Sequence, residues 1–345
     1  MRHVDWNQEY PEVPKTVHNS VLDALSRLDE QKQEENTMKK TPKKRILLIA
    51  ATLTALIGTT AAASGIFQWN ERASQVFEAD KAIQDELTME QMAQDISQSV
   101  TDQGITITAI QTIQDKNRFY ALFEVKAEDP ELKITSDYSM DYTMDLEGKE
   151  DPFCALEWSF VSENVQEVSN TRYFEIYGTK HEQSEEDLTM NLNFTALRGE
   201  PEKKAGEGEI LVSGEWNFAL DIHTFEMLSY TIDAEYQLGG EAVHINSIAL
   251  SPLTMEIVYD GSDIHTLEAK QNANLNELDE LQGIYPTGVR YEDGTTTEEG
   301  LMISLSEGFE DKEETTYKLL LPFHKVITPE KVTEILFDET AVTLK

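Results

Sequence analysis

The side chains that most often carry out chemistry are spread along this chain without a recognisable spacing. No HExxH pair, Cys/His zinc pattern, glycine-rich phosphate loop or GxSxG motif occurs. The seven histidines lie apart, at positions 3, 18, 181, 223, 244, 265 and 324. The sequence therefore predicts no catalytic residues, no metal site and no cofactor, and we expect that the protein is not an enzyme.

Carboxylates are so abundant that many acid–base pairs can be drawn. The densest clusters lie at 182–187 and 310–314, and neither has the central glycine of a calcium loop. Solvated surface charge explains both clusters. A hydrolase with an unrecognised carboxylate pair remains one functional hypothesis, besides the two given at the end of this section. A deep acidic cleft in the structure would favour it. The single cysteine, Cys154, has no intramolecular partner, and we expect a small core residue there.

Composition narrows the classes of partner. The formal net charge of −37 argues against nucleic acid as a partner, because phosphates would be repelled. The 39% hydrophobic content is enough to build folded cores.

One uncharged stretch determines the expected topology. Residues 46–67 contain no charged side chain, and a helix of this length covers the roughly 30 Å hydrocarbon layer. Trp69 follows, where an interfacial aromatic anchor belongs. A basic cluster precedes the stretch and keeps the N-terminus in the cytoplasm: Lys39, Lys40, Lys43, Lys44 and Arg45. We therefore predict a single-pass protein of the cell membrane, with its C-terminal part outside the cell.

The competing interpretation is a cleaved signal peptide, because Ala61, Ala62 and Ala63 resemble a cleavage site. Signal peptides have apolar cores of about 7–15 residues. Here the apolar run is longer and 45 residues precede it, which favours an uncleaved anchor.

The cytoplasmic segment has one apolar stripe at helical spacing. Its members are Val17, Val21, Leu22, Leu25 and Leu28. A helix lying on the inner leaflet explains such a stripe, as does a helix that docks on a cytoplasmic protein. Asp23 and Asp29 beside Arg27 favour the protein partner, because membrane-surface helices have basic polar faces.

The remainder changes to the period of two that is typical of strands. We predict a mainly β fold: two extracellular β-sandwich-like (immunoglobulin-like) domains after one transmembrane helix and a short cytoplasmic helix. The expected divisions are a cytoplasmic segment at 1–45, the span at 46–67, a helical connector at 68–98, and β domains at 99–225 and 226–345.

Some elements of these domains can be placed. A hairpin with one buried face is expected from Ile105 to Val125, turning at Asp115-Lys116-Asn117. The clearest strand has five alternating apolar positions between Leu188 and Ala196, and another runs from Trp216 to Ile222. Residues 261–262 are expected to form a turn, and residues 272–281 a short helix.

Two stretches resemble the start of Firmicute membrane proteins that carry the DUF4179 domain. The first is Asp5-Trp6-Asn7 followed by Val13-Pro14 and 17–22, and the second is 65–73 followed by 84–87 and 99–107. The resemblance extends over residues 1–220, and a DUF5643-like domain is expected beyond. It implies an anti-sigma-factor-like role in which the helix at 17–28 binds an extracytoplasmic-function sigma factor. The zinc-type anti-sigma motif is absent.

Two functional hypotheses follow. In the first, the outer domains sense an unknown extracellular ligand or envelope condition, and the inner helix holds a sigma factor. In the second, the protein is a surface-binding or structural component of the envelope, and the inner segment only directs insertion.

We predict that cell fractionation recovers the whole chain with the membranes, because the uncharged stretch stays in the lipid. Immunodetection of both ends would check this. A polypeptide free in the medium that begins near Ser64 would contradict the two-compartment topology.

Overall fold

The computed structural model describes residues 67–345, apart from 147–150, 163–168, 181–186, 200–207, 275–280, 298–305 and the single positions 282, 311, 324, 339 and 345. The predicted cytoplasmic helix, the basic cluster and all but the last residue of the predicted span lie outside the described residues. No helix within the described ranges is both long and apolar enough to cross a bilayer.

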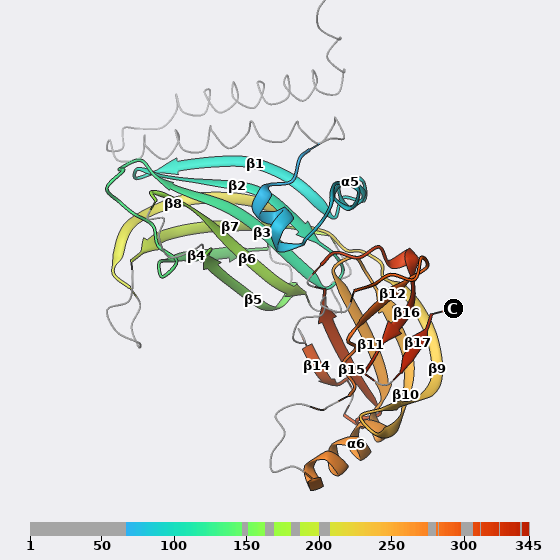
Figure 1. Cartoon of the computed structure of the whole chain (residues 1–345). Helices are drawn as coiled ribbons and strands as arrows, with labels where there is room; N and C mark the ends of the chain where they lie inside the picture. The colour runs from blue at the N-terminus through green and yellow to red at the C-terminus, as the bar shows by residue number, and fades with distance from the viewer. Residues whose placement is uncertain are drawn as a thin grey trace, which may run out of the picture. The chain divides into compact units, whose positions relative to one another are not determined.

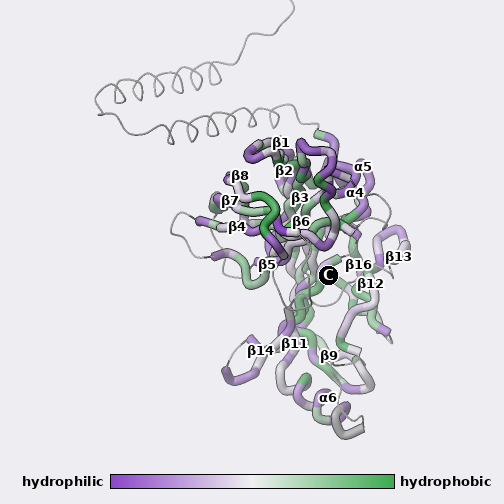
Figure 2. The backbone as a smooth tube through the Cα atoms, turned by 90° about the vertical axis from the view of Figure 1, so that its left-hand side faces the viewer, coloured by the Kyte–Doolittle hydropathy of each residue, from purple (hydrophilic) through white to green (hydrophobic). Residues whose placement is uncertain are grey.

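The described chain opens with two short helices, α4 (Glu71–Val76) and α5 (Lys81–Met89). The side chain of Asn70 caps α4, and that of Asp80 accepts from the Ile83 amide at the start of α5. The helical connector expected to reach residue 98 ends earlier, because strand β1 (Ala93–Asp102) begins at Ala93. Figure 2 shows how hydrophilic β1 is. The sequence of β1 has only a weak strand pattern, and the segment forms a strand because it pairs with β2.

Two antiparallel sheets enclose the core of the first β domain (Figure 1). The five-stranded sheet has the order β1-β2-β3-β6-β5, and the three-stranded sheet has the order β4-β7-β8. The strands are β2 (Ile105–Gln114), β3 (Arg118–Ala127), β4 (Ser139–Asp145), β5 (Phe153–Phe160), β6 (Thr171–Lys180), β7 (Leu188–Arg198) and β8 (Ile210–Ile222). The prediction of a mainly β protein is therefore confirmed.

The clearest strand predictions are confirmed. β2 and β3 form the expected hairpin, and β7 pairs with β8. The alternating apolar side chains of β7 and β8 point into one core, where Phe194 contacts Phe123, Phe174 and Phe218 with ring centroids 5.3–6.0 Å apart.

The expectation of a single buried face was wrong for β3. Phe119, Ala121 and Phe123 lie in the core between the sheets, as predicted. Tyr120 and Leu122 on the opposite face are buried as well. Their cover comes from α4 and α5, and a strand covered on both faces loses the simple alternation of apolar and polar residues.

A second pair of antiparallel sheets encloses a second core. Their orders are β14-β15-β11-β10-β9 and β13-β12-β16-β17. The strands are β9 (Leu228–Leu238), β10 (Glu241–Leu250), β11 (Thr254–Asp260), β12 (Gly288–Tyr291), β13 (Thr296–Thr297), β14 (Ser306–Phe309), β15 (Thr316–Pro322), β16 (Val332–Leu336) and β17 (Ala341–Thr343). Helix α6 (Gly261–Asn274) packs on β10, β11 and β15, and the 3₁₀ turn η2 (Pro329–Lys331) precedes β16.

The two β domains repeat one topology. In each, the first three strands and the fifth and sixth form one sheet, with the sixth beside the third, and the fourth, seventh and eighth form the other. The second domain adds the short β13 beside its fourth strand, β12. The turn between β2 and β3 therefore corresponds to the turn between β10 and β11.

Two local predictions are corrected. Residues 261–262 begin α6 instead of forming a turn, because Asp260 accepts hydrogen bonds from the backbone and side chain of Ser262 at the helix start. Cys154 is exposed and not a core residue, because it lies on β5 at the sheet edge, where most side chains face solvent.

We expect Phe194→Ala to lower the free energy of unfolding by about 3–5 kcal/mol, because it leaves a cavity among three aromatic rings. Urea unfolding of the full-length chain in detergent, followed by circular dichroism, measures the change. The exposed control Leu211→Ala on β8 should change it by less than about 0.5 kcal/mol. Equal losses in the two variants would contradict the described core.

Candidate functional site at the domain junction

The residues after the predicted membrane span pack where the two β domains meet. One apolar cluster, called the junction cluster below, joins three parts of the chain. They are the helical segment that consists of α4 and α5 with the residues beside them, the outer face of the first sheet, and two residues of the second domain. The central members of the cluster are Trp69, Phe77, Leu87, Tyr120, Leu122, Leu253 and Val326. The Val326 amide also donates to the Phe77 carbonyl at 3.0 Å. The helical segment is therefore part of a three-way junction.

Trp69 has a different environment from the one expected. Only 3% of the residue is exposed, its ring contacts that of Phe77 edge-on, and its indole N–H donates to Thr88 at 3.3 Å. A ring covered in this way has no face left for lipid headgroups. The structure therefore favours a packing role for Trp69 over the predicted interfacial one.

An ion pair between a half-buried arginine and a buried glutamate fastens α4 to the first sheet. The Arg72 guanidinium donates to both carboxylate oxygens of Glu175, at 2.9 and 3.0 Å. The Tyr120 hydroxyl donates to the same carboxylate at 2.8 Å. The hydrogen bond with Glu175 raises the pKa of Arg72, and burial raises the pKa of Tyr120 well above its ordinary value. The carboxylate is thus compensated on both oxygens, as a buried charge requires.

The two corresponding turns meet through hydrogen bonds. Asp115 Oδ1 accepts from the amides of Asn117 and Arg118 in its own turn, and Ser251 Oγ accepts from the amides of Leu253 and Thr254 in the other. Across the junction, Ser251 and Thr254 donate their hydroxyl groups to Asp115 Oδ2.

Asn117 Nδ2 completes the contact by donating to Thr254 Oγ1 at 3.2 Å. Asp115, Asn117, Ser251 and Thr254 are all at most 1% exposed. Hydrogen bonds are directional, so this buried polar contact determines the relative orientation of the two turns as well as the distance between them.

Lys180 contacts the linker between the two domains, which is the segment 223–227 between β8 and β9. Its ammonium donates to the Gln114 side chain and to the carbonyls of Asp115 and His223, at 3.1, 2.7 and 2.8 Å. The ring of Phe225 lies 5.6 Å from Nζ. Burial lowers the pKa of Lys180 to about 8.

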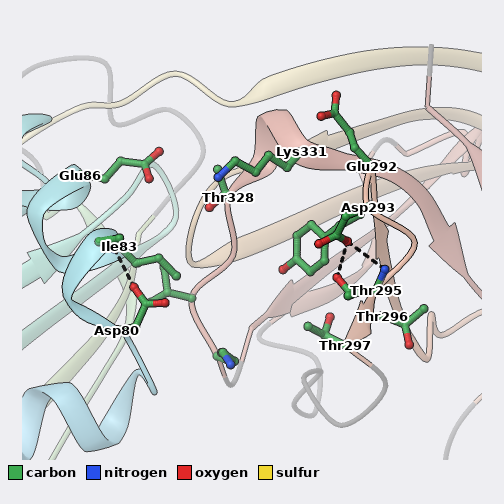
Figure 3. A pocket seen from close by; sticks show the side chains of 14 residues that line it. Asp80, Ile83, Glu86, Glu292, Asp293, Thr295, Thr296, Thr297, Thr328 and Lys331 are labelled. Atoms are coloured by element: carbon green, nitrogen blue, oxygen red, sulfur yellow. Dashed lines mark hydrogen bonds between the residues drawn. The ribbon is translucent and has the colours of Figure 1, made fainter.

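A cavity of about 560 Å³ opens beside this junction, between α5 and the second domain (Figure 3). Glu86 of α5 and Asp80, which caps that helix, line it on one side, and the β12–β13 turn contributes Glu292 and Asp293. Lys331 reaches into it from η2. Within the part of the chain that the structure describes, no three His, Cys, Asp or Glu side chains lie close enough to share a metal ion.

The other predicted site residues precede the described part of the chain. Val17, Val21, Leu22, Leu25 and Leu28 lie outside the described residues, as do Lys39, Lys40, Lys43, Lys44 and Arg45. The junction residues gave only partial signals in the sequence. Asp115-Lys116-Asn117 was recognisable as a turn and 65–73 as a family-like stretch, but nothing local marked Glu175 or Ser251 as their partners.

Comparison with known proteins finds that part of this region is similar to a described family. Residues 38–127 match the family model "Domain of unknown function (DUF4179)". The match begins at the basic cluster, continues through the predicted span, α4, α5, β1 and β2, and ends at the last residue of β3. No curated protein matches the chain.

One solved structure shows a loose similarity. It is described as "The crystal structure of the conserved domain protein from Bacillus anthracis". The two chains are 11% identical, with 71% of this chain and 76% of that chain covered and a TM-score of 0.44.

We expect Lys180 to make stability depend on pH. The pKa of Lys180 is lowered from its ordinary value of 10.5 to about 8 in the folded protein, so between these two pH values the unfolded chain binds more protons. The free energy of unfolding should therefore rise with pH relative to a Lys180→Met variant, by at most about 1.4 kcal/mol per pH unit.

Urea unfolding of both proteins at a series of pH values from about 8 to about 10.5 tests this. Lys126→Met is the matched control, because Lys126 is exposed, and its difference from the wild type should be independent of pH. A constant difference for Lys180→Met across the window would contradict the buried ammonium.

Proposed function

We propose that the protein is a single-pass membrane regulator of the anti-sigma-factor-like type. Its two β domains lie outside the cell and sense a ligand or an envelope condition, and its cytoplasmic helix at 17–28 holds an extracytoplasmic-function sigma factor. The proposal includes no enzymatic activity.

The observation that carries it is the position of the helical segment. α4 begins four residues after Phe67, the last residue of the predicted span, and its Ala73 is fully buried in the junction cluster. A connection this short and this firmly packed transmits a displacement. A long flexible linker would absorb one. A change in how the two domains meet would therefore act directly on the membrane segment.

The extent of the family match supports the same proposal. It joins the basic cluster, the apolar stretch, the helical segment and the first three strands in one unit of sequence. In a regulator of this type, such a unit would link the membrane helix to β3, the strand that is buried on both faces. The DUF4179 description itself names no activity.

The immunoglobulin-like part of the proposal has support in the strand order. β2-β3-β6-β5 and β4-β7-β8 follow the order A-B-E-D and C-F-G of constant-type immunoglobulin domains, with β1 added at the edge. Domains of this architecture are common at cell surfaces. The same feature favours the alternative, a surface-binding or structural envelope protein without a regulatory role.

We expect Val21→Asp/Leu25→Asp to abolish capture of the sigma factor by the full-length protein, because two carboxylates would interrupt the apolar stripe. Affinity purification from cells measures capture, and transcription from sigma-dependent promoters should rise. Ser26→Ala/Asp23→Ala on the polar face of the same helix is the matched control and should behave as the wild type.

Cys154 supplies a check that every variant is inserted in the proposed orientation. It is the single cysteine in the sequence and is exposed, so a membrane-impermeant maleimide should label intact cells and fail to label Cys154→Ser. Unchanged capture and transcription in a correctly inserted double variant would favour the structural alternative.

A further inference from the structure

The cavity beside the junction has the size of a small-molecule site. Its volume of about 560 Å³ falls within the roughly 300–1,000 Å³ of ligand pockets. Its walls come from segments more than 200 positions apart in the sequence, α5 on one side and the β12–β13 and η2 regions on the other (Figure 3). A molecule bound there would contact the helical segment and the second domain at once.

Carboxylates on both walls determine the charge that the cavity accepts. Asp80, which caps α5, and Glu86 on α5 line one side, and Glu292 and Asp293 line the other. Two ammonium groups, those of Lys325 and Lys331, also belong to the lining. Asp293 is held ionised, because hydrogen bonds from Thr295 lower its pKa. The excess of carboxylates attracts cations and repels anions.

Carboxylates also repel one another next to the cavity. Burial raises the pKa of Glu90 at the end of α5, and so do the neighbouring carboxylates of Glu86 and Glu330. Glu330 belongs to η2 in the second domain, so like charges face each other across this seam. Of these three carboxylates, Glu86 is the one that borders the cavity.

Hydroxyl groups complete the lining. Thr295, Thr296, Thr297 and Thr328 border the cavity, and each hydroxyl can both donate and accept hydrogen bonds. A wholly apolar ligand would cover these groups and the carboxylates without replacing their water, at a cost in free energy. The lining therefore suits a ligand that carries several hydroxyl groups of its own.

We propose that this cavity binds a small, hydroxyl-rich molecule that carries an ammonium group, the chemistry of an amino sugar. The ammonium contacts carboxylates from both walls, and the ligand hydroxyls bond with the threonines and lysines. The role of this site in signalling rests on the proposed function. In that function, ligand binding would displace α5, and the displacement would reach the membrane segment through α4.

The test uses the full-length chain in detergent and three probes that share one sugar ring. D-glucosamine has the ammonium and the hydroxyls, D-glucose lacks the ammonium, and D-glucose 6-phosphate adds negative charge. We expect a saturable rise in the thermal unfolding midpoint with glucosamine, a smaller one with glucose and none with the phosphate. Glucosamine should also slow hydrogen exchange in α5.

Removing one carboxylate from each wall makes the test specific. Glu86→Gln/Glu292→Gln should weaken glucosamine binding about tenfold, because two charge-assisted contacts are lost. Glu131→Gln/Glu157→Gln, at exposed positions of the first domain, is the matched control with the same change in net charge and should bind as the wild type.

Three results would overturn the inference: no saturable shift with glucosamine, the same affinity in the two double variants, or equal affinity for glucose. None of these bears on sigma-factor capture by the cytoplasmic helix. Failure of the ligand site and failure of the proposed regulator are therefore distinguishable.

Discussion

The arrangement of the described chain depends on the burial of β3 on both faces. One face contributes Phe119 and Phe123 to the core between the sheets, and the other contributes Tyr120 and Leu122 to the junction cluster. An outer sheet face this apolar has to be covered, because its exposure to water would cost about 25 cal/mol per Å². The helical segment provides that cover, and this requirement places the residues that follow the predicted membrane span against the folded domains.

Polar contacts then determine how the parts are oriented. The apolar cluster brings α4, the first sheet and the second domain together, but hydrophobic contact alone is not directional. The Arg72–Glu175 ion pair supplies direction, and so do the hydrogen bonds that Ser251 and Thr254 donate to Asp115. Because the carboxylates of Glu175 and Asp115 are buried, any arrangement that leaves one of them without its partners costs free energy.

The repeated topology gives this polar contact its form. Corresponding turns of the two domains cap themselves in the same way, Asp115 with its carboxylate and Ser251 with its hydroxyl. The acceptor in one turn and the donor in the other then pair directly. Helix α5 has two roles beside this contact, since Leu87 packs in the cluster while Glu86 lines the cavity.

The sequence by itself determined the local elements with strong periodic patterns. The alternation from Leu188 to Ala196 and from Trp216 to Ile222, and the turn signal at Asp115, predicted strands and a hairpin that the structure confirms, because each depends only on near neighbours. The same reasoning failed for β1, whose polar sequence becomes a strand through pairing with β2, and for the start of α6, where the capping role of Asp260 decided.

Only the tertiary structure decided the junction and the cavity. Arg72 and Glu175 are 103 positions apart, and Asp115 and Ser251 are 136 apart, so no local pattern could pair them. Tertiary packing also buried Trp69 and exposed Cys154, in both cases against the expectation from the sequence. The physical reason is the same throughout: periodicity shows which face of an element is apolar, whereas the identity of what covers that face depends on contacts between distant parts of the chain.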